Sequence, residues 1–213
     1  SGSAMGLNWE NENLPAIVQA FYPGEQAGKA IADLLWGEFS PSGRLPVTFY
    51  KSVDDLPDFG DYSMANRTYK YYEGEPLYPF GHGLSYTSFD YSGLSVPETH
   101  DASEPLPVSA TVTNTGDMPG REVVQAYIQH QDRAHAAIPQ VELVAFEVVE
   151  LAPGESQTVS LTLSAERIGY YAIDGKFVTP QGTEAILSLG SGQPGFVKDS
   201  AIETSSVRFE RNE

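Results

Sequence analysis

The sequence contains no cysteine among its 213 residues. This absence excludes disulfides, thiolate zinc sites and a cysteine nucleophile together. A cysteine-free chain suits a bacterial protein from any compartment, so the redox environment stays open. No apolar run approaches the roughly 20 residues needed to cross a bilayer, and we expect no membrane partner.

Basic side chains are scarce as well. The chain has 12 Lys and Arg against 29 Asp and Glu, a formal net charge of -17. Phosphate binding needs a basic footprint, so this balance argues against a nucleic-acid partner. A neutral sugar is unaffected by it. Such a charge keeps a secreted protein soluble. Separately, we expect an extracytoplasmic location, periplasmic or secreted, in a bacterium.

The first fifty residues have an α/β pattern. Residues 15–21 form a short apolar run that is typical of a strand and ends at a turn signal, residues 22–24. Apolar side chains recur on one face of a helix predicted over residues 25–38. Residues 44–49 then resemble a second strand, at an edge because of Pro46.

Two strands and one helix cannot build an independent parallel sheet, because both of its faces need cover. We therefore expect residues 1–50 to be the C-terminal end of a larger α/β sandwich domain. The rest of that domain would be attached covalently or lie on a separate chain. The alternative is a stand-alone, non-catalytic carbohydrate-binding or scaffold module. That alternative requires cover within this chain for the apolar side chains Ile17, Val18, Leu34 and Leu35.

The remaining sequence divides into a linker and an all-β region. Residues 51–84 are rich in Asp, Tyr, Gly and Pro, and we expect this aromatic linker to pack along a surface. Residues 85–213 contain short β-type segments separated by turn signals, which predicts an antiparallel β-sandwich. These segments are 108–113, 122–129, 141–151, 158–163 and 185–189.

Several segments, in the right order, resemble glycoside hydrolase family 3. In the first part they are 22–28 (YPGEQAG), 34–37 (LLWG), 41–48 (PSGRLPVT), 67–72 (RTYKYY) and 76–86 (PLYPFGHGLSY). The β region is similar to the family's fibronectin type III-like (immunoglobulin-like) domain through 114–116 (NTG), Gly120, 122–125 (EVVQ) and 153–156 (PGES). Two features depart from the family pattern. Ala145 stands where glycine is frequent, and residues 196–213 match nothing in it.

The resemblance implies part of a retaining exo-β-glycosidase, a β-glucosidase or β-xylosidase that hydrolyses terminal non-reducing β-linked sugars without a cofactor. Such chemistry needs two carboxylates about 5–5.5 Å apart. In the family, the aspartate nucleophile and the acid/base glutamate precede the YPG motif, and neither matches a position here. The resemblance thus implies no catalytic residue in this chain. It also implies a structural role beside a missing N-terminal catalytic half, and an oligosaccharide substrate that binds the complete enzyme.

The remaining candidate residues have structural interpretations. Carboxylates crowd the linker, and we interpret them as solvated loop groups: Asp54, Asp55, Asp58, Asp61, Glu73 and Glu75. His130 and His135 lack a carboxylate at metal-ligand spacing, so no metal site is expected. His82 lies in a glycine turn, where its backbone should matter more than its ring. Trp36 is expected in a core, and residues 69–72 between the domains rather than on a sugar.

Overall fold

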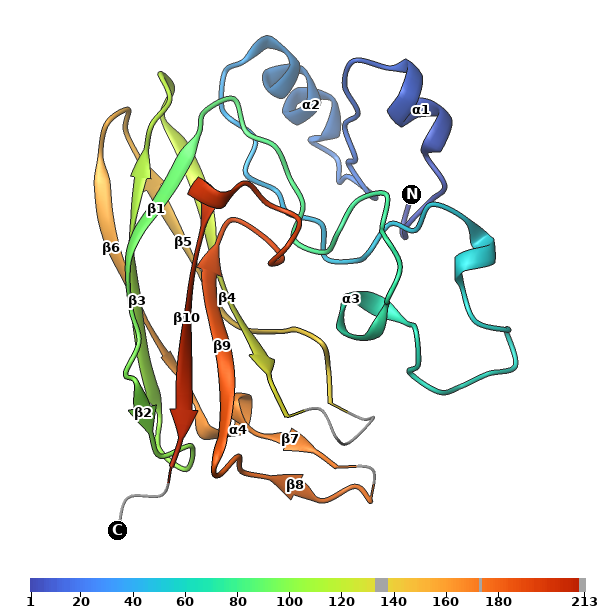
Figure 1. The fold of residues 1–213 in the computed structure, drawn as a ribbon. Coiled ribbons are helices and arrows are strands. Elements are labelled where there is room, and N and C mark those ends of the chain that lie inside the picture. Colours follow the sequence, from blue (N-terminus) through green and yellow to red (C-terminus); the bar gives the residue numbers. More distant parts are fainter. Residues whose placement is uncertain (133–137, 173, 211–213) are drawn as a thin grey trace.

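The structure, a computed structural model, describes residues 1–132, 138–172 and 174–210. Its main body is an antiparallel β-sandwich, with the N-terminal half of the chain on the side of the larger sheet (Figure 1). One sheet has the order β1-β3-β6, the other β2-β10-β9-β4-β5. The strands are β1 Phe89–Ser95, β2 Thr99–His100, β3 Leu106–Asn114, β4 Gly120–His130, β5 Glu142–Leu151, β6 Ser156–Leu163, β9 Thr183–Gly190 and β10 Ile202–Phe209.

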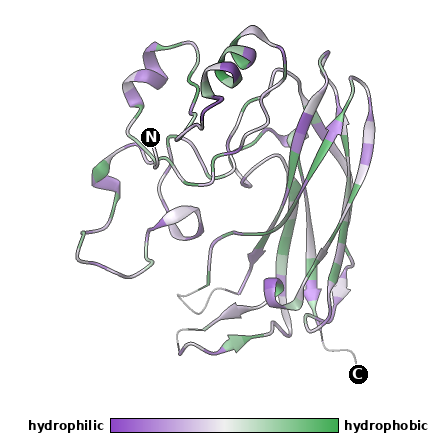
Figure 2. Ribbon diagram, turned by 180° about the vertical axis from the view of Figure 1, so that it is seen from behind, coloured by the Kyte–Doolittle hydropathy of each residue, from purple (hydrophilic) through white to green (hydrophobic). Residues whose placement is uncertain are grey.

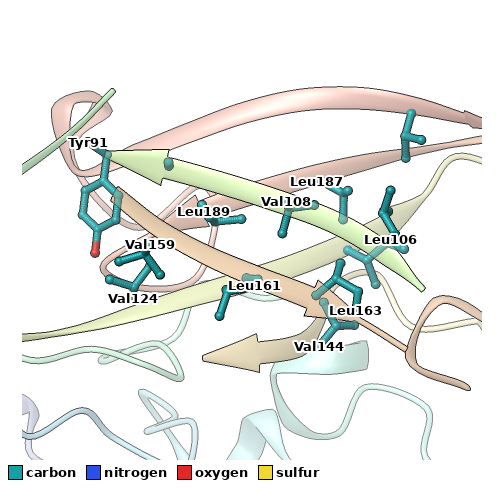
Figure 3. Close-up of a cluster of buried hydrophobic side chains, with 14 of the residues drawn as sticks. Tyr91, Leu106, Val108, Val124, Val144, Val159, Leu161, Leu163, Leu187 and Leu189 are labelled. Carbon is teal, nitrogen blue, oxygen red and sulfur yellow. The ribbon is translucent and has the colours of Figure 1, made fainter. Parts of the chain in front are cut away.

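The sandwich core follows from alternation along the strands. In β3 every second side chain is buried, from Leu106 to Val112, and those between are half-buried or exposed. Leu161 of β6 and Leu187 of β9 meet this row from the two sheets (Figure 3). The predicted antiparallel sandwich is therefore confirmed. Strands β3, β4, β5, β6 and β9 coincide with the five segments predicted from the sequence.

The last strand, β10, was not predicted. It pairs with β9 along its whole length and with the short β2 on its other side. Val207 and Phe209 are fully buried in the core. The preceding residues of this strand are mostly Glu, Thr and Ser, so its apolar pattern is too short to be recognised. A small hairpin, β7 Tyr170–Tyr171 and β8 Phe177–Val178, follows the one-turn helix α4 Ala165–Ile168.

The N-terminal half consists of short helices joined by irregular chain. The elements are α1 Asn8–Asn13, α2 Ala27–Trp36, the 3-10 turn η1 Val53–Asp55 and α3 Thr68–Tyr71. Helix α2 confirms the predicted helix. It ends where Gly37 takes a left-handed conformation, with φ of 74°, and donates its N–H to the carbonyls of Asp33 and Leu34. No helix among the described residues is long and apolar enough to cross a membrane.

The two strands predicted in this half are wrong. Residues 15–21 have no strand pairing, and in residues 44–49 only Phe49 forms an isolated bridge, with Tyr78. A strand needs a neighbour for its N–H and C=O groups, and no described residue supplies one to residues 15–21.

Exposure in this half decides between the two interpretations of residues 1–50. Ile17, Val18 and Leu35 are exposed and Leu34 is half-buried, contrary to the requirement of a stand-alone module. Trp36 is 80% exposed, so the expectation that it lies in a core is wrong for the described residues. The surface that would bury these side chains is not part of the described chain.

Candidate functional site at the buried junction

The linker carboxylates stabilise their own loop. Asp55 accepts the Ser52 N–H, and Asp58 accepts that of Gly60. Asp61 accepts the Ser63 N–H, which lowers the pKa of its carboxyl. Glu75 pairs with Lys51, and this hydrogen bond lowers the pKa of Glu75. A glycosidase general acid needs a raised pKa, whereas the pKa values of Asp61 and Glu75 are lowered.

Glu122 on β4 is different, because burial raises the pKa of its carboxyl. Its side chain is fully buried. Arg44 Nη2 donates to one oxygen at 2.6 Å, and the hydroxyl of Tyr91 donates to the other at 2.9 Å. With both oxygens occupied and no exposed surface, this carboxyl cannot contact a sugar. No motif in the sequence indicates its partner Arg44, which lies in the N-terminal half.

Backbone hydrogen bonds carry Arg44 to Glu122. The Leu45 N–H donates to the His82 carbonyl at 2.8 Å, and the Gly81 N–H donates to the Leu45 carbonyl at 2.7 Å. Gly83 must lack a side chain, since a Cβ there would lie 2.1 Å from the Gly43 carbonyl oxygen. These contacts tie residues 43–45 to the glycine turn of the linker and direct the guanidinium into the end of the sandwich.

A second contact covers the outer face of the five-stranded sheet. The Tyr127 hydroxyl donates to Gln125 Oε1 at 2.6 Å, and Gln125 Nε2 donates to the Ser191 carbonyl at 2.7 Å. Gly81 lies directly over this pair with φ of +77°, and a Cβ on it would approach Gln125 Oε1 to 2.5 Å. The unusual backbone of the turn is therefore at Gly81. The ring of the neighbouring His82 stacks on Tyr78 with centroids 5.1 Å apart.

Aromatic side chains of the linker complete the junction, by which we mean the contact between the N-terminal half and the sandwich around Arg44, Gly81 and Glu122. Tyr69 stacks on Phe80 with ring centroids 4.0 Å apart and meets Tyr127 edge-on at 6.5 Å. The Tyr69 hydroxyl accepts the Leu143 N–H at 3.1 Å. The predicted packing between the domains is confirmed for Tyr69, whereas residues 51–66 of the linker are mostly exposed, contrary to the expectation that the whole linker packs along a surface.

The described histidines, His82, His100 and His130, do not gather into one cluster. His130 is buried and meets Tyr170 edge-on with centroids 5.2 Å apart, and burial lowers the pKa of its imidazole. His135 lies outside the described residues. Within those residues, no group of three or more His, Cys, Asp or Glu side chains could hold a metal ion.

The N-terminal half exposes many large apolar side chains. Figure 2 shows hydrophobic positions on α2, outside the sandwich. Monomeric proteins seldom leave this much apolar surface in water, and such a surface is typical of a site of contact with another protein surface. The exposed side chains are Met5, Trp9, Leu14, Ile17, Val18, Tyr22, Leu35, Trp36, Phe39, Val47, Val53, Leu56, Phe59, Tyr62, Met64, Leu84 and Tyr86.

Comparison with known families assigns both parts of the chain. Residues 1–86 match the glycosyl hydrolase family 3 C-terminal domain, and residues 122–191 match a fibronectin type III-like domain. A solved structure of a β-D-glucoside glucohydrolase from Trichoderma reesei superposes with a TM-score of 0.82 at 29% identity. That match covers 97% of this chain and 32% of the other.

Curated relatives agree with these matches. A xylan 1,4-β-xylosidase of Xylanibacter ruminicola is 39% identical over 194 residues, which are 87% of this chain and 22% of the relative. The thermostable β-glucosidase B of Acetivibrio thermocellus is 34% identical over 227 residues, 99% of this chain and 30% of the relative. A periplasmic β-glucosidase of Salmonella typhimurium is 33% identical over 195 residues, which are 85% of this chain and 25% of the relative. The chain thus spans between a fifth and a third of the length of these relatives.

Proposed function

The chain belongs to glycoside hydrolase family 3, as its C-terminal domain followed by a fibronectin type III-like domain, and we propose that it is the supporting part of a retaining exo-β-glycosidase. The complete enzyme would remove terminal non-reducing glucose or xylose from β-linked oligosaccharides through a covalent glycosyl-enzyme intermediate. The names of the relatives, a xylan xylosidase and β-glucosidases, support this substrate class.

The enclosure of Glu122 is the observation that carries the proposal. A retaining mechanism needs a nucleophilic carboxylate and a second carboxyl with a raised pKa at the same sugar. Glu122 has a raised pKa, but Arg44 and Tyr91 occupy both of its oxygens. The catalytic pair is therefore expected on residues outside these 213. No cofactor is needed for such chemistry.

The role of the chain is to cover and hold the catalytic half. The exposed apolar side chains of the N-terminal half would pack against the rest of the enzyme, which the relatives carry in the remaining two thirds or more of their length. The ion pair of Arg44 and Glu122 would then fix the sandwich to that assembly. We further propose an extracytoplasmic role in polysaccharide degradation, which the periplasmic relative supports.

Hydrolysis of nitrophenyl β-glucoside and nitrophenyl β-xyloside tests the proposal. We expect the 213-residue chain to be inactive alone. A longer protein that adds the region preceding these residues in the relatives should be active and insensitive to EDTA. Turnover by the chain alone would contradict the placement of the catalytic pair elsewhere. Inactivity of both proteins would contradict the proposed glycosidase activity.

A further inference from the structure

A groove beside the junction, which shares Tyr69 with it, combines charged, hydrogen-bonding and aromatic groups on accessible surface. It has a volume of about 460 Å³, within the range of about 300–1,000 Å³ that is usual for small-molecule sites. It lies between α3 of the linker, helix α4 and β5, an edge strand of the larger sheet. Figure 1 shows α3 beside this sheet and α4 at its lower end. Its lining residues are Tyr69, Lys70, Glu142, Leu143, Val144, Ala145, Phe146 and Arg167.

The polar groups of the groove are arranged to donate and to accept. Lys70 and Glu142 form an ion pair whose side chains remain 32% and 23% exposed, so both can still reach a ligand. The Tyr69 hydroxyl accepts the Leu143 N–H, which leaves its own hydrogen available. Arg167 is exposed and forms no ion pair with the described residues, so its guanidinium can donate to a bound molecule.

The groove also contains the exposed aromatic ring of Phe146. Phe146 is 63% exposed although it lies in the middle of β5, opposite Gln125 of β4. Strand β5 is the edge of the five-stranded sheet, so no further strand of that sheet covers the ring. An aromatic ring packs well against the apolar face of a pyranose, while neighbouring donors and acceptors bind its hydroxyl groups.

From these contacts we infer that the groove binds a short, neutral, β-linked oligosaccharide. Phe146 would stack on one sugar ring, Arg167 and Tyr69 would donate to hydroxyl oxygens, and Glu142 would accept from a hydroxyl. The lining has one anionic side chain, Glu142, and two cationic ones, Lys70 and Arg167, so the groove is not acidic although the chain as a whole has a net charge of -17. The choice of a β-linked oligosaccharide rests on the proposed function, because the related enzymes are named for β-glucosides and xylan. The groove would keep the polymer near the enzyme.

Titration calorimetry on the full 213-residue chain tests this inference without any catalytic step. The probes are xylohexaose and cellohexaose, with the α-linked maltohexaose as the control sugar. We expect binding of at least one β-linked probe, and a loss of about tenfold in affinity in F146A and in R167Q, which corresponds to about 1.4 kcal/mol. The matched controls are V148A, on the same strand but outside the lining, and R121Q, an exposed arginine elsewhere on the sandwich.

Three results would overturn the inference: no heat with either β-linked probe, binding that F146A and R167Q leave unchanged, or equal binding of maltohexaose. Failure of the longer enzyme to bind where the chain does would also overturn it, because the groove would then be an internal surface. Each result is independent of the nitrophenyl glycoside assay. If the groove binds no sugar, the proposed glycosidase function is not contradicted. If the longer enzyme hydrolyses no nitrophenyl glycoside, the calorimetric result for the groove is not affected.

Discussion

Arg44 and Glu122 are 78 positions apart in sequence, yet Nη2 and Oε2 meet at 2.6 Å in the interior of the protein. The arginine side chain is 9% exposed and the glutamate 0%. Two buried charges lose hydration that their attraction recovers only when the geometry is good. The second glutamate oxygen is bound by Tyr91, but the buried Arg44 Nε has no hydrogen-bond partner among the described residues. The pair therefore specifies how the two halves meet more than it stabilises them.

Removing one member of this pair should be more harmful than removing both. R44M leaves the Glu122 carboxylate buried without its cation, and we expect the free energy of unfolding to fall by about 3–5 kcal/mol. The double variant R44M/E122L should recover part of that loss, because both desolvation penalties disappear. Urea unfolding followed by circular dichroism measures this. The control R208Q, in the exposed pair with Glu184, should have little effect. Equal losses in R44M and R208Q would contradict the buried role.

His130 should make the sandwich sensitive to acid. Burial holds the pKa of its imidazole below the ordinary value of 6.5, so below that pH the unfolded chain binds a proton that the folded chain excludes. Its contribution to stability is complete above about pH 6.5 and declines as the pH falls toward its lowered folded pKa. H130F keeps an aromatic ring between Tyr170 and Phe209, and should reduce the loss of stability between pH 7.5 and 5.5.

The comparison of H130F with the parent chain at each pH isolates this effect. Burial also lowers the pKa of His82, which should preserve part of the slope. The raised pKa of Glu122 acts in the opposite direction. The stability that this carboxyl contributes falls as the pH rises from 4.5, its pKa in the unfolded chain, toward its higher pKa in the folded chain. A slope in H130F identical to that of the parent chain would show that His130 is not responsible.

Gly81 should tolerate a methyl group less well than another glycine of the same conformation. Gly81 and Gly154 have φ of +77° and +75°, so alanine pays similar backbone strain at both. Only at Gly81 does the Cβ meet side chains, at 2.5 Å from Gln125 Oε1 and 2.8 Å from the Tyr127 hydroxyl. We expect G81A to cost about 1–3 kcal/mol more than G154A in urea unfolding. Equal costs would mean that the junction can move away from the turn.

The exposed side chains of α2 should promote self-association without supporting the fold. W36S removes an indole that is 80% exposed. The free energy of unfolding of the 213-residue chain should change by less than about 0.5 kcal/mol. Sedimentation velocity should show less association, because an apolar contact surface is lost. The control Y171S, on the sandwich hairpin, should leave association unchanged. In the longer enzyme, W36S should instead lower stability, and an unchanged longer enzyme would argue against burial of this helix.

The periodicity of apolar residues predicted the helix and the strands that carry their apolar side chains on one face. The apolar face of residues 25–38 predicted α2, and alternation predicted β3, β6 and β9, since each buries its own periodic side chains. Residues 15–21 failed for the opposite reason. Their apolar run describes a strand with neighbours on both sides, and those neighbours are not among the described residues.

The junction shows a second limit of sequence reasoning. The motifs that contain Arg44 and Glu122 were both recognised, but nothing in either shows that they form one ion pair. Contacts across 78 positions depend on how whole elements pack. The same is true of the groove. Tyr69 and Phe146 are ordinary aromatic residues until α3 is placed beside β5.

The position of β10 has a consequence for biosynthesis. This strand lies between β9 and β2, and its Val207 and Phe209 are fully buried. The ribosome delivers it after every other strand of the sandwich, at about 5–20 residues per second. Until then β9 has an open edge and the core lacks two of its side chains. The sandwich must therefore close after synthesis of residue 209, and a messenger truncated after residue 201 would yield a product prone to aggregation and degradation.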